Sequence, residues 1–202
     1  AKADARSGLG LPREAVVVGF PAAYEPRKGQ DVALAAFARI ADGFPHAHLL
    51  LAGSETTLAG GADYVDTLRR EAAASRAAAR IHLRGRCDDM ALFYAACDVV
   101  LALSRDGEAF GMIAAEAALS ERPLVGTRTG ATPEVVRDGE TGHLVAPGDI
   151  EATAEALSTL LSYPELRGRL GRQARIVAAT AFDPAPALDQ FEAVYRALAN
   201  GR

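Results

Sequence analysis

The chain is poor in the residues that build metal sites and disulfide frameworks. Its 202 residues include two cysteines and four histidines, and tryptophan is absent. Cys87 and Cys97 form no CxxC spacing, and they suit buried thiols in a reducing compartment. The histidines are dispersed and match no spacing of metal ligands; they are His46, His48, His82 and His143. We therefore expect a protein without a bound metal.

Clusters of positive charge and long apolar runs are also missing. The sequence has 22 Lys and Arg against 26 Asp and Glu, a net charge of -4 and a pI near 5.6. This balance argues against a general nucleic-acid surface, because phosphate backbones are bound by clustered Lys and Arg. No segment reaches the roughly 18 apolar residues of a membrane span, and the first residues lack a signal peptide's apolar core. We expect a cytoplasmic protein without a membrane span, and the start at Ala1 instead of Met suggests a processed or internal end.

Three common catalytic signatures do not occur in the chain. It has no GxSxG nucleophile elbow, no P-loop and no GxGxxG fingerprint, so hydrolase, NTPase and dinucleotide-binding functions lose support. Apolar residues, in contrast, are abundant, since half of the sequence is hydrophobic. This composition and length predict one well-cored domain over residues 1–202.

The apolar residues form short strand-like runs that alternate with longer Ala- and Leu-rich segments. Several runs are apolar without alternation, which is typical of strands covered on both faces of a parallel sheet. The repeated strand–helix order predicts an α/β fold, a doubly wound, Rossmann-like parallel sheet of about six strands that binds ligands beyond the carboxyl ends of its strands. The expected strands are 15–20, 48–53, 81–83, 99–103, 124–127 and 142–145, and the expected helices between them are 30–42, 64–79, 90–96, 111–120 and 132–137.

The tail of the chain follows a different pattern. Helices are expected at 149–162, 164–179 and 186–199, with no strand among them. Pro164 suits the start of a helix, because proline has no N–H to lose there. We expect these C-terminal helices to cap the sheet or to cross to another domain. The glycine-rich segment 59–62 is expected to form a loop.

The most informative segment runs from Glu108 to Glu116 and follows an expected strand. A helix should begin near Gly111, which leaves the amides of Met112 and Ile113 without intrahelical partners at the positive end of the helix dipole, where they can bind a diphosphate. Glu116 lies one turn later on the same face, within reach of a ribose diol. Glu108 precedes the helix, and its oxygens can accept hydrogen bonds from a sugar. Taken alone, an acidic residue in the first turns of a helix is equally well explained by the helix dipole.

Other loops at the same edge of the sheet offer further candidates, each of them weak by itself. Lys28 follows the first strand and can neutralise a leaving diphosphate, although an exposed lysine is more often only a solvated charge. Gly53 and Ser54 end the second strand, where glycine permits close approach of a phosphate or base. Arg86, in the basic turn after the third strand, can frame a nucleobase or shield phosphate charge, and is equally compatible with an ordinary turn.

The motifs occur in an order that is similar to one family. The Glu-x7-Glu pattern of Glu108 and Glu116 encloses a Phe110–Gly111 step and continues into segments 122–136 and 138–145. Over nearly the whole chain, these segments resemble the C-terminal, donor-binding half of retaining glycosyltransferases of the GT-B fold, in particular family 4. The resemblance implies transfer of a hexose-type sugar from a UDP, GDP or ADP sugar to an acceptor, with the acceptor-binding N-terminal domain absent from this chain.

The resemblance also implies a role for each candidate residue. Glu116 would hold the ribose, Glu108 the transferred sugar, and the amides after the Phe-Gly step the diphosphate. Lys28 matches the family's phosphate-binding lysine, a cation that stabilises charge on the leaving group without a metal or another cofactor. The catalytic candidates are thus Lys28 and Glu108, and the donor-binding candidates are Gly53, Ser54, Arg86, Phe110, Gly111, Met112, Ile113 and Glu116.

The sequence departs from the family pattern in the loop after the first strand. The family commonly has Gly-Arg where Ala22 and Ala23 stand, so one phosphate-binding charge is missing, and a lost contact of this kind costs about 1.5–3 kcal/mol. Glu121 also occupies a position that is often glycine. Two alternatives stay open: a non-catalytic nucleotide-sugar-binding module, and a GT-B sugar-nucleotide epimerase or phosphorylase-like enzyme.

Overall fold

The computed structural model describes residues 1–55 and 61–199, which form a six-stranded parallel sheet with the strand order β3-β2-β1-β4-β5-β6. This sheet confirms the expected doubly wound α/β fold. The order reverses between β1 and β4, so the loops after these two strands leave in opposite directions and open a crevice at the carboxyl edge. The strands are β1 (Val16–Pro21), β2 (Ala47–Ala52), β3 (Ile81–Arg84), β4 (Val99–Ala102), β5 (Leu124–Thr127) and β6 (Gly142–Val145).

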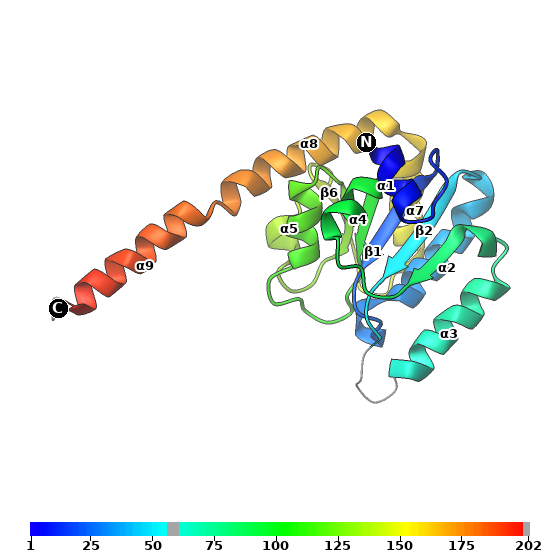
Figure 1. Cartoon of the computed structure of the whole chain (residues 1–202), viewed down its shortest axis with the longest axis horizontal. Coiled ribbons are helices and arrows are strands. Elements are labelled where there is room, and N and C mark those ends of the chain that lie inside the picture. Colours follow the sequence, from blue (N-terminus) through cyan, green and yellow to red (C-terminus); the bar gives the residue numbers. More distant parts are fainter. Residues whose placement is uncertain (56–60, 200–202) are drawn as a thin grey trace.

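Helices cover both faces of the sheet (Figure 1). The described helices are α1 (Lys2–Gly8), α2 (Gln30–Ile40), α3 (Gly61–Ala74), α4 (Met90–Ala96), α5 (Met112–Leu119), α6 (Thr132–Val135), α7 (Ile150–Ser162), α8 (Pro164–Ala181) and α9 (Pro184–Ala199). Short 3-10 turns are η1 (Pro26–Lys28), η2 (Ala41–Gly43) and η3 (Ala78–Arg80). Residues 59 and 60 of the expected loop lie outside the described residues, whereas Gly61 and Ala62 already belong to α3, so the expectation of a loop was wrong at these two positions.

The core has two parts because neighbouring side chains of each strand point to opposite faces of the sheet. Val18 packs with Phe37 on the face that carries α2, α3 and α7. Val17 packs with Phe93 on the face that carries α4 and α5. Full burial of a side chain of this size contributes about 1.5–3 kcal/mol. Burial on both faces explains why the strands are apolar without alternation.

Side-chain caps fix the starts of two helices. The Asp89 carboxylate accepts a hydrogen bond of 2.8 Å from the Leu92 amide at the start of α4. Asp149 caps α7 in the same way, with 2.9 Å to the Ala152 amide. Each cap satisfies an otherwise orphan N–H and contributes about 1 kcal/mol. The α4 cap fixes the direction of the chain between β3 and β4, next to the crevice.

The three C-terminal helices differ in how they meet the sheet domain. Helix α7 packs on α2, and α8 packs on α5, so both cap the domain as expected. Helix α9 has no buried side chain and extends away from the domain as a continuation of α8 (Figure 1). Within residues 1–55 and 61–199, no helix combines the length and apolar character that crossing a bilayer requires.

Candidate functional site

Two pockets lie at the carboxyl edge of the sheet, where the strand order reverses. The first, the Glu108 pocket, has a volume of about 310 Å³ and is lined by Lys28, Ala102, Glu108, Ala109, Phe110, Gly111, Met112, Ile113, Ala114 and Thr132. The second, the Glu116 pocket, has a volume of about 240 Å³ and is lined by Pro21, Ala22, Ala23, Ala52, Gly53, Arg86, Cys87, Met90, Tyr94 and Glu116. All candidate residues from the sequence except Ser54 line one of these pockets.

Lys28 and Glu108 form an ion pair across the Glu108 pocket. The Lys28 ammonium and the Ser104 hydroxyl both donate hydrogen bonds to Oε1 of Glu108. Arg27 adds a second cation, with Nη1 at 3.9 Å from the same oxygen. Burial opposes ionisation of Glu108, but the hydrogen bonds from Lys28 and Ser104 and the two positive charges outweigh it and hold its pKa below the usual range. Glu108 is therefore a carboxylate at neutral pH and can only accept hydrogen bonds.

The backbone around Glu108 is fixed by a close approach of the loop after β5. The Glu108 carbonyl accepts a hydrogen bond of 2.9 Å from the Ala131 amide. A Cβ atom on Gly130 would lie 2.3 Å from the Glu108 nitrogen, so no side chain fits there. In the sequence, Gly130 shortly precedes Thr132 and Pro133, a pattern typical of a helix start. The structure gives it the additional role of packing against the Glu108 loop.

The first turn of α5 presents free amides to the Glu108 pocket. The helix begins at Met112, directly after Gly111, and the Gly111 carbonyl accepts hydrogen bonds from Ala114 and Ala115. Within residues 1–55 and 61–199, the amides of Met112 and Ile113 donate no hydrogen bond. These donors stand at the positive end of the helix dipole, which favours an anionic group. The neighbouring Phe110 side chain is 52% exposed, so it forms an outer wall and not part of the core.

A buried tyrosine orients Glu116 at the floor of the second pocket. The Tyr94 hydroxyl donates a hydrogen bond of 2.8 Å to Oε2 of Glu116. Burial, together with the adjacent carboxylate, raises the pKa of Tyr94, so the phenol keeps its proton and remains a donor. Within the described part of the chain, Oε1 of Glu116 has no hydrogen-bond partner, which leaves that oxygen for a ligand hydroxyl.

The remaining candidates have different surroundings. Gly53 lines the Glu116 pocket, but an added Cβ would lie 1.9 Å from the Ala22 carbonyl oxygen, so packing of two loops already requires glycine. Ser54 is exposed and lines neither pocket; its carbonyl accepts a hydrogen bond of 3.0 Å from the Tyr24 amide. Arg86 lines the Glu116 pocket, with its exposed guanidinium 2.8 Å from Asp88.

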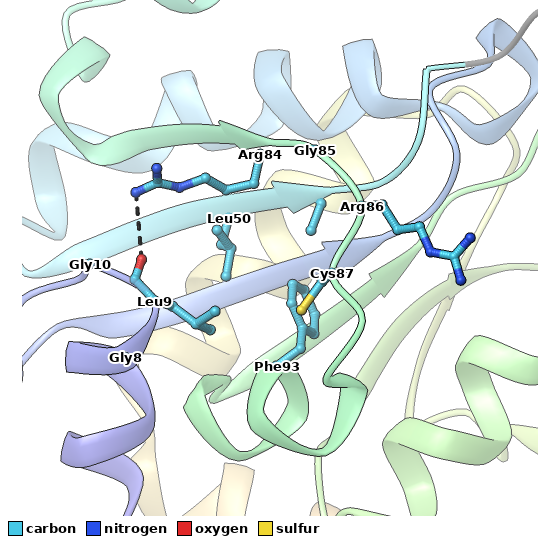
Figure 2. A pocket seen from close by; sticks show the side chains of 10 residues that line it. Gly8, Leu9, Gly10, Leu50, Arg84, Gly85, Arg86, Cys87 and Phe93 are labelled. Atoms are coloured by element: carbon cyan, nitrogen blue, oxygen red, sulfur yellow. Dashed lines mark hydrogen bonds between the residues drawn. The ribbon is translucent and has the colours of Figure 1, made fainter.

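A third cavity of about 440 Å³ lies beside the Glu116 pocket and shares Ala52, Arg86 and Cys87 with it. Figure 2 shows its apolar floor, formed by Leu50 and Phe93, between the end of α1 and the loop after β3. On its rim, Arg84 donates a long hydrogen bond of 3.5 Å to the Leu9 carbonyl. Of the site residues expected from the sequence, Arg86 alone lines this cavity.

Three contributors to the pockets were missed in the sequence: Tyr94, Ser104 and Arg27. In the sequence, Tyr94 resembles the apolar residues of α4, and its hydrogen-bond partner Glu116 is 22 positions away along the chain. Ser104 ends the apolar run of β4, so its position after a strand was the one available signal. An arginine next to a lysine is typical of a solvated surface, so the sequence offers no signal for the position of Arg27 near Glu108.

Comparison with known sequences gives a consistent result. Residues 1–177 match the family described as Glycosyl transferases group 1. D-inositol 3-phosphate glycosyltransferase of Corynebacterium glutamicum (strain R) is 34% identical over 200 residues, which cover 96% of this chain and 47% of that protein. Phosphatidyl-myo-inositol mannosyltransferase of Mycobacterium tuberculosis (strain ATCC 25618 / H37Rv) is 36% identical over 167 residues, or 79% of this chain and 42% of that protein. The chain thus spans about half the length of the curated relatives that it matches.

Solved structures with the same fold include proteins with bound sugar nucleotides. Anabaena HepE in complex with UDP superposes with a TM-score of 0.88 and 27% identity, over 97% of this chain and 52% of that one. The UDP-glucose complex of HepE gives a TM-score of 0.87. Sucrose-phosphate synthase from Thermosynechococcus elongatus gives 0.85 with 30% identity, over 99% of this chain and 49% of that one.

Proposed function

The chain belongs to the group 1 glycosyl transferases, and we propose that it is the donor-binding domain of a retaining enzyme of family 4 that moves a hexose-type sugar from a nucleoside diphosphate sugar to an acceptor. One observation carries this proposal: Glu108, the free amides of α5 and Glu116 follow one another along the chain and line the two pockets at this edge of the sheet. A sugar, a diphosphate and a ribose are joined in the same order in the donor.

The Glu116 pocket receives the nucleoside in this proposal. Oε1 of Glu116 accepts hydrogen bonds from the ribose hydroxyls, while Tyr94 holds the other oxygen. The base lies toward the wall formed by Gly53 and Arg86, where a planar group meets little steric hindrance. Ser54 lines neither pocket, so its part in donor binding has the weakest support among the candidates.

The Glu108 pocket receives the diphosphate and the transferred sugar. The amides of Met112 and Ile113 bind phosphate oxygens, and Lys28 stabilises the charge that grows on the leaving group as the glycosidic bond breaks. Glu108 accepts hydrogen bonds from the sugar hydroxyls. Because Glu108 and Lys28 are paired with each other, donor binding must replace that contact with contacts to the sugar and to phosphate.

We propose further that catalysis needs an acceptor-binding domain that is not part of these 202 residues. The match to about half of each relative supports this view. So does α9, which carries five large apolar side chains that are 58–70% exposed, namely Leu188, Phe191, Val194, Tyr195 and Leu198. Spacings of three and four place them on one face of the helix. That face fits a second domain of the same enzyme.

A non-catalytic nucleotide-sugar-binding module is the second candidate. Ala23 favours it, because this residue lines the Glu116 pocket without offering a charge to a phosphate. The two candidates predict the same donor binding and differ in transfer. Sugar transfer by the protein extended with an acceptor-binding domain would decide for the enzyme.

The donor-site assignment is tested by thermal unfolding with UDP, GDP, ADP and their sugar conjugates. A nucleotide at about 100 times its dissociation constant should add about 2.7 kcal/mol to the free energy of unfolding. UDP is the first choice because HepE was crystallised with it. Glu116→Ala should lose the effect, whereas Glu165→Ala, on the exposed first turn of α8, should keep it. Equal stabilisation of both variants would refute the assignment.

A further inference from the structure

A hydrogen-bonded network outside the two pockets joins the loops that carry the two catalytic candidates. Arg105, in the turn after β4, makes two hydrogen bonds to the η1 turn after β1. Its amide donates a hydrogen bond of 2.7 Å to the Arg27 carbonyl, and its guanidinium donates to the Pro26 carbonyl. The same guanidinium binds both carboxylate oxygens of Asp31 at the start of α2, with 2.9 Å between Nη1 and Oδ1. The turn after β4 and the η1 turn are therefore tied directly to each other.

The network continues from Asp31 to the first part of the same β1–α2 loop, where Ala22 and Ala23 line the Glu116 pocket. The Tyr64 hydroxyl lies 3.0 Å from Oδ1 of Asp31 and 3.2 Å from Oε1 of Gln30. Gln30 is fully buried, and its amide group donates a hydrogen bond of 2.8 Å to the Ala23 carbonyl. The loop between β1 and α2 and the loop between β4 and α5 are thus held together by one continuous set of side chains, which come from α2, α3 and the turn after β4.

Outside this network, the η1 turn is held by the Lys28–Glu108 and Arg27–Glu25 ion pairs and by the neighbouring Gly29, which packs closely on the Leu103 carbonyl. None of its three residues, which include Lys28, is buried, so core packing does not fix the position of the turn. The side chains of Arg105 and Asp31 are 37% and 36% exposed, and a pair of that kind adds little to global stability. Its contribution is geometric: a bidentate contact with further bonds to two backbone carbonyls leaves the turn little freedom.

The charges in the network favour this arrangement. Burial opposes ionisation of Asp31, but the hydrogen bonds and positive charge of Arg105 outweigh burial and hold the pKa of Asp31 below its usual range. Burial and the nearby Asp31 charge raise the pKa of Tyr64, so its hydroxyl keeps its proton. At neutral pH the network therefore has one fixed pattern of donors and acceptors.

We propose that Arg105 is a positioning residue for diphosphate binding: it holds the η1 turn so that Lys28 faces the free amides of α5. This inference rests on the proposed function. Arg105 lines neither pocket, so it acts through the position of Lys28 and not by touching the ligand. Its loss should weaken binding of the diphosphate part of a nucleotide and spare the nucleoside part.

The test compares dissociation constants of UDP and uridine by titration calorimetry, with the pairs GDP–guanosine and ADP–adenosine measured beside them. For Arg105→Gln we expect the constant for the diphosphate to rise about 10-fold, equivalent to about 1.4 kcal/mol, and that for the nucleoside to change less than about twofold. Arg39→Gln is the matched control, since it breaks a surface ion pair with Glu151 that joins α2 to α7. The control should change neither constant.

Further variants separate positioning from general damage. Asp31→Asn should give a selective loss of the same kind, and the double variant should lose no more than Arg105→Gln alone, because both substitutions break the Arg105–Asp31 contact. Tyr64→Phe removes only a hydroxyl, and it takes the place of Arg105→Gln as the test variant if Arg105→Gln does not fold. Equal weakening of nucleotide and nucleoside, or no weakening, would overturn the inference alone. If the unmodified chain binds no nucleotide, the proposed function fails and this inference fails with it.

Discussion

Tyr94 and Glu116 meet across the interface of α4 and α5, where the tyrosine hydroxyl donates a hydrogen bond of 2.8 Å to Oε2 of the glutamate. Tyr94 also ties α4 to the segment before β5, because its carbonyl accepts a hydrogen bond of 2.9 Å from Arg122. Glu116 therefore cannot turn freely toward the pocket. One of its oxygens is committed to the protein, and the other is available to a ligand.

Tyr94→Phe should weaken nucleotide binding without disrupting the core. The ring is buried and keeps its packing, but Glu116 loses the donor that orients it. We expect the dissociation constant to rise about 5-fold, since a hydrogen bond to a charged group is worth about 1.5–3 kcal/mol at most here and water can replace part of it. Titration calorimetry measures the change, with Tyr195→Phe on exposed α9 as the control. Unchanged affinity would show that Tyr94 does not orient a ligand-binding group.

Substitutions of Lys28 and Glu108 should have different effects on the dissociation constant of UDP. Lys28→Ala should raise the dissociation constant of UDP about 10-fold or more, because a charge-assisted contact to phosphate contributes about 1.5–3 kcal/mol. Glu108→Gln should not weaken UDP binding, since it releases Lys28 from its partner. It should instead lower the affinity of UDP-glucose relative to UDP. If Glu108→Gln weakened both ligands equally, a role for Glu108 at the transferred sugar would be refuted.

Ala23→Arg should restore a charge to the nucleotide site. Ala23 lines the Glu116 pocket, and its carbonyl is held by the buried Gln30, so a longer side chain can extend from a fixed backbone. We expect UDP to bind about 10-fold more tightly, within the about 1.5–3 kcal/mol of a charge-assisted hydrogen bond, while uridine affinity stays the same. Ala38→Arg on the exposed side of α2 adds the same charge away from the pocket. An equal gain in UDP affinity for the Ala38→Arg variant would show a general charge effect. It would refute the alignment that places a phosphate-binding arginine at position 23.

The sequence predicted the sheet well because strand formation here depends on local, continuous apolar runs. It failed where a distant or polar contact decides the structure. Helix α1 was not predicted: it is short and is anchored by Arg6, whose guanidinium lies 2.6 Å from the buried Asp98 carboxylate of a distant segment. Helix α3 was expected to reach residue 79, but it ends at Ala74. The Ser75 hydroxyl accepts a hydrogen bond of 3.2 Å from the Ala77 amide, and that local contact competes with the helix.

The same distinction applies to the pockets. Candidates within the segment from Glu108 to Glu116 lie on one loop and one helix, so their order in space follows from their order in the chain. The pairing of Lys28 with Glu108 joins residues 80 positions apart. It depends on the reversal of strand order between β1 and β4, which no local pattern reports. Alternation alone predicts a doubly wound sheet without predicting which loops face each other.

Acid should destabilise the β2–β3 edge of the sheet through two histidines. His48 and His82 stack with ring centroids 5.2 Å apart, and Nδ1 of His48 lies 2.9 Å from Nε2 of His82. Burial, the adjacent His48 ring, which competes for a proton, and the positive charge of Arg84 lower the pKa of His82 to about 4. Burial, with Arg80 and His46 nearby, also lowers the pKa of His48. Both rings are therefore neutral in the folded protein at neutral pH.

The direction of the pH effect follows from the difference between the histidine pKa values of the folded and the unfolded chain. An unfolded histidine has a pKa of about 6.5, so between about pH 4 and 6.5 the unfolded chain binds more protons than the folded one. The free energy of unfolding should then fall as pH decreases through this range, and it should lose no further contribution from His82 below about pH 4. His82→Gln cannot be protonated and should flatten the decline, whereas His46→Gln, at an exposed position, should leave most of it. Urea unfolding at pH 7.5, 6, 5 and 4 measures the slopes; parallel curves for His82→Gln and the unmodified chain would contradict the assignment.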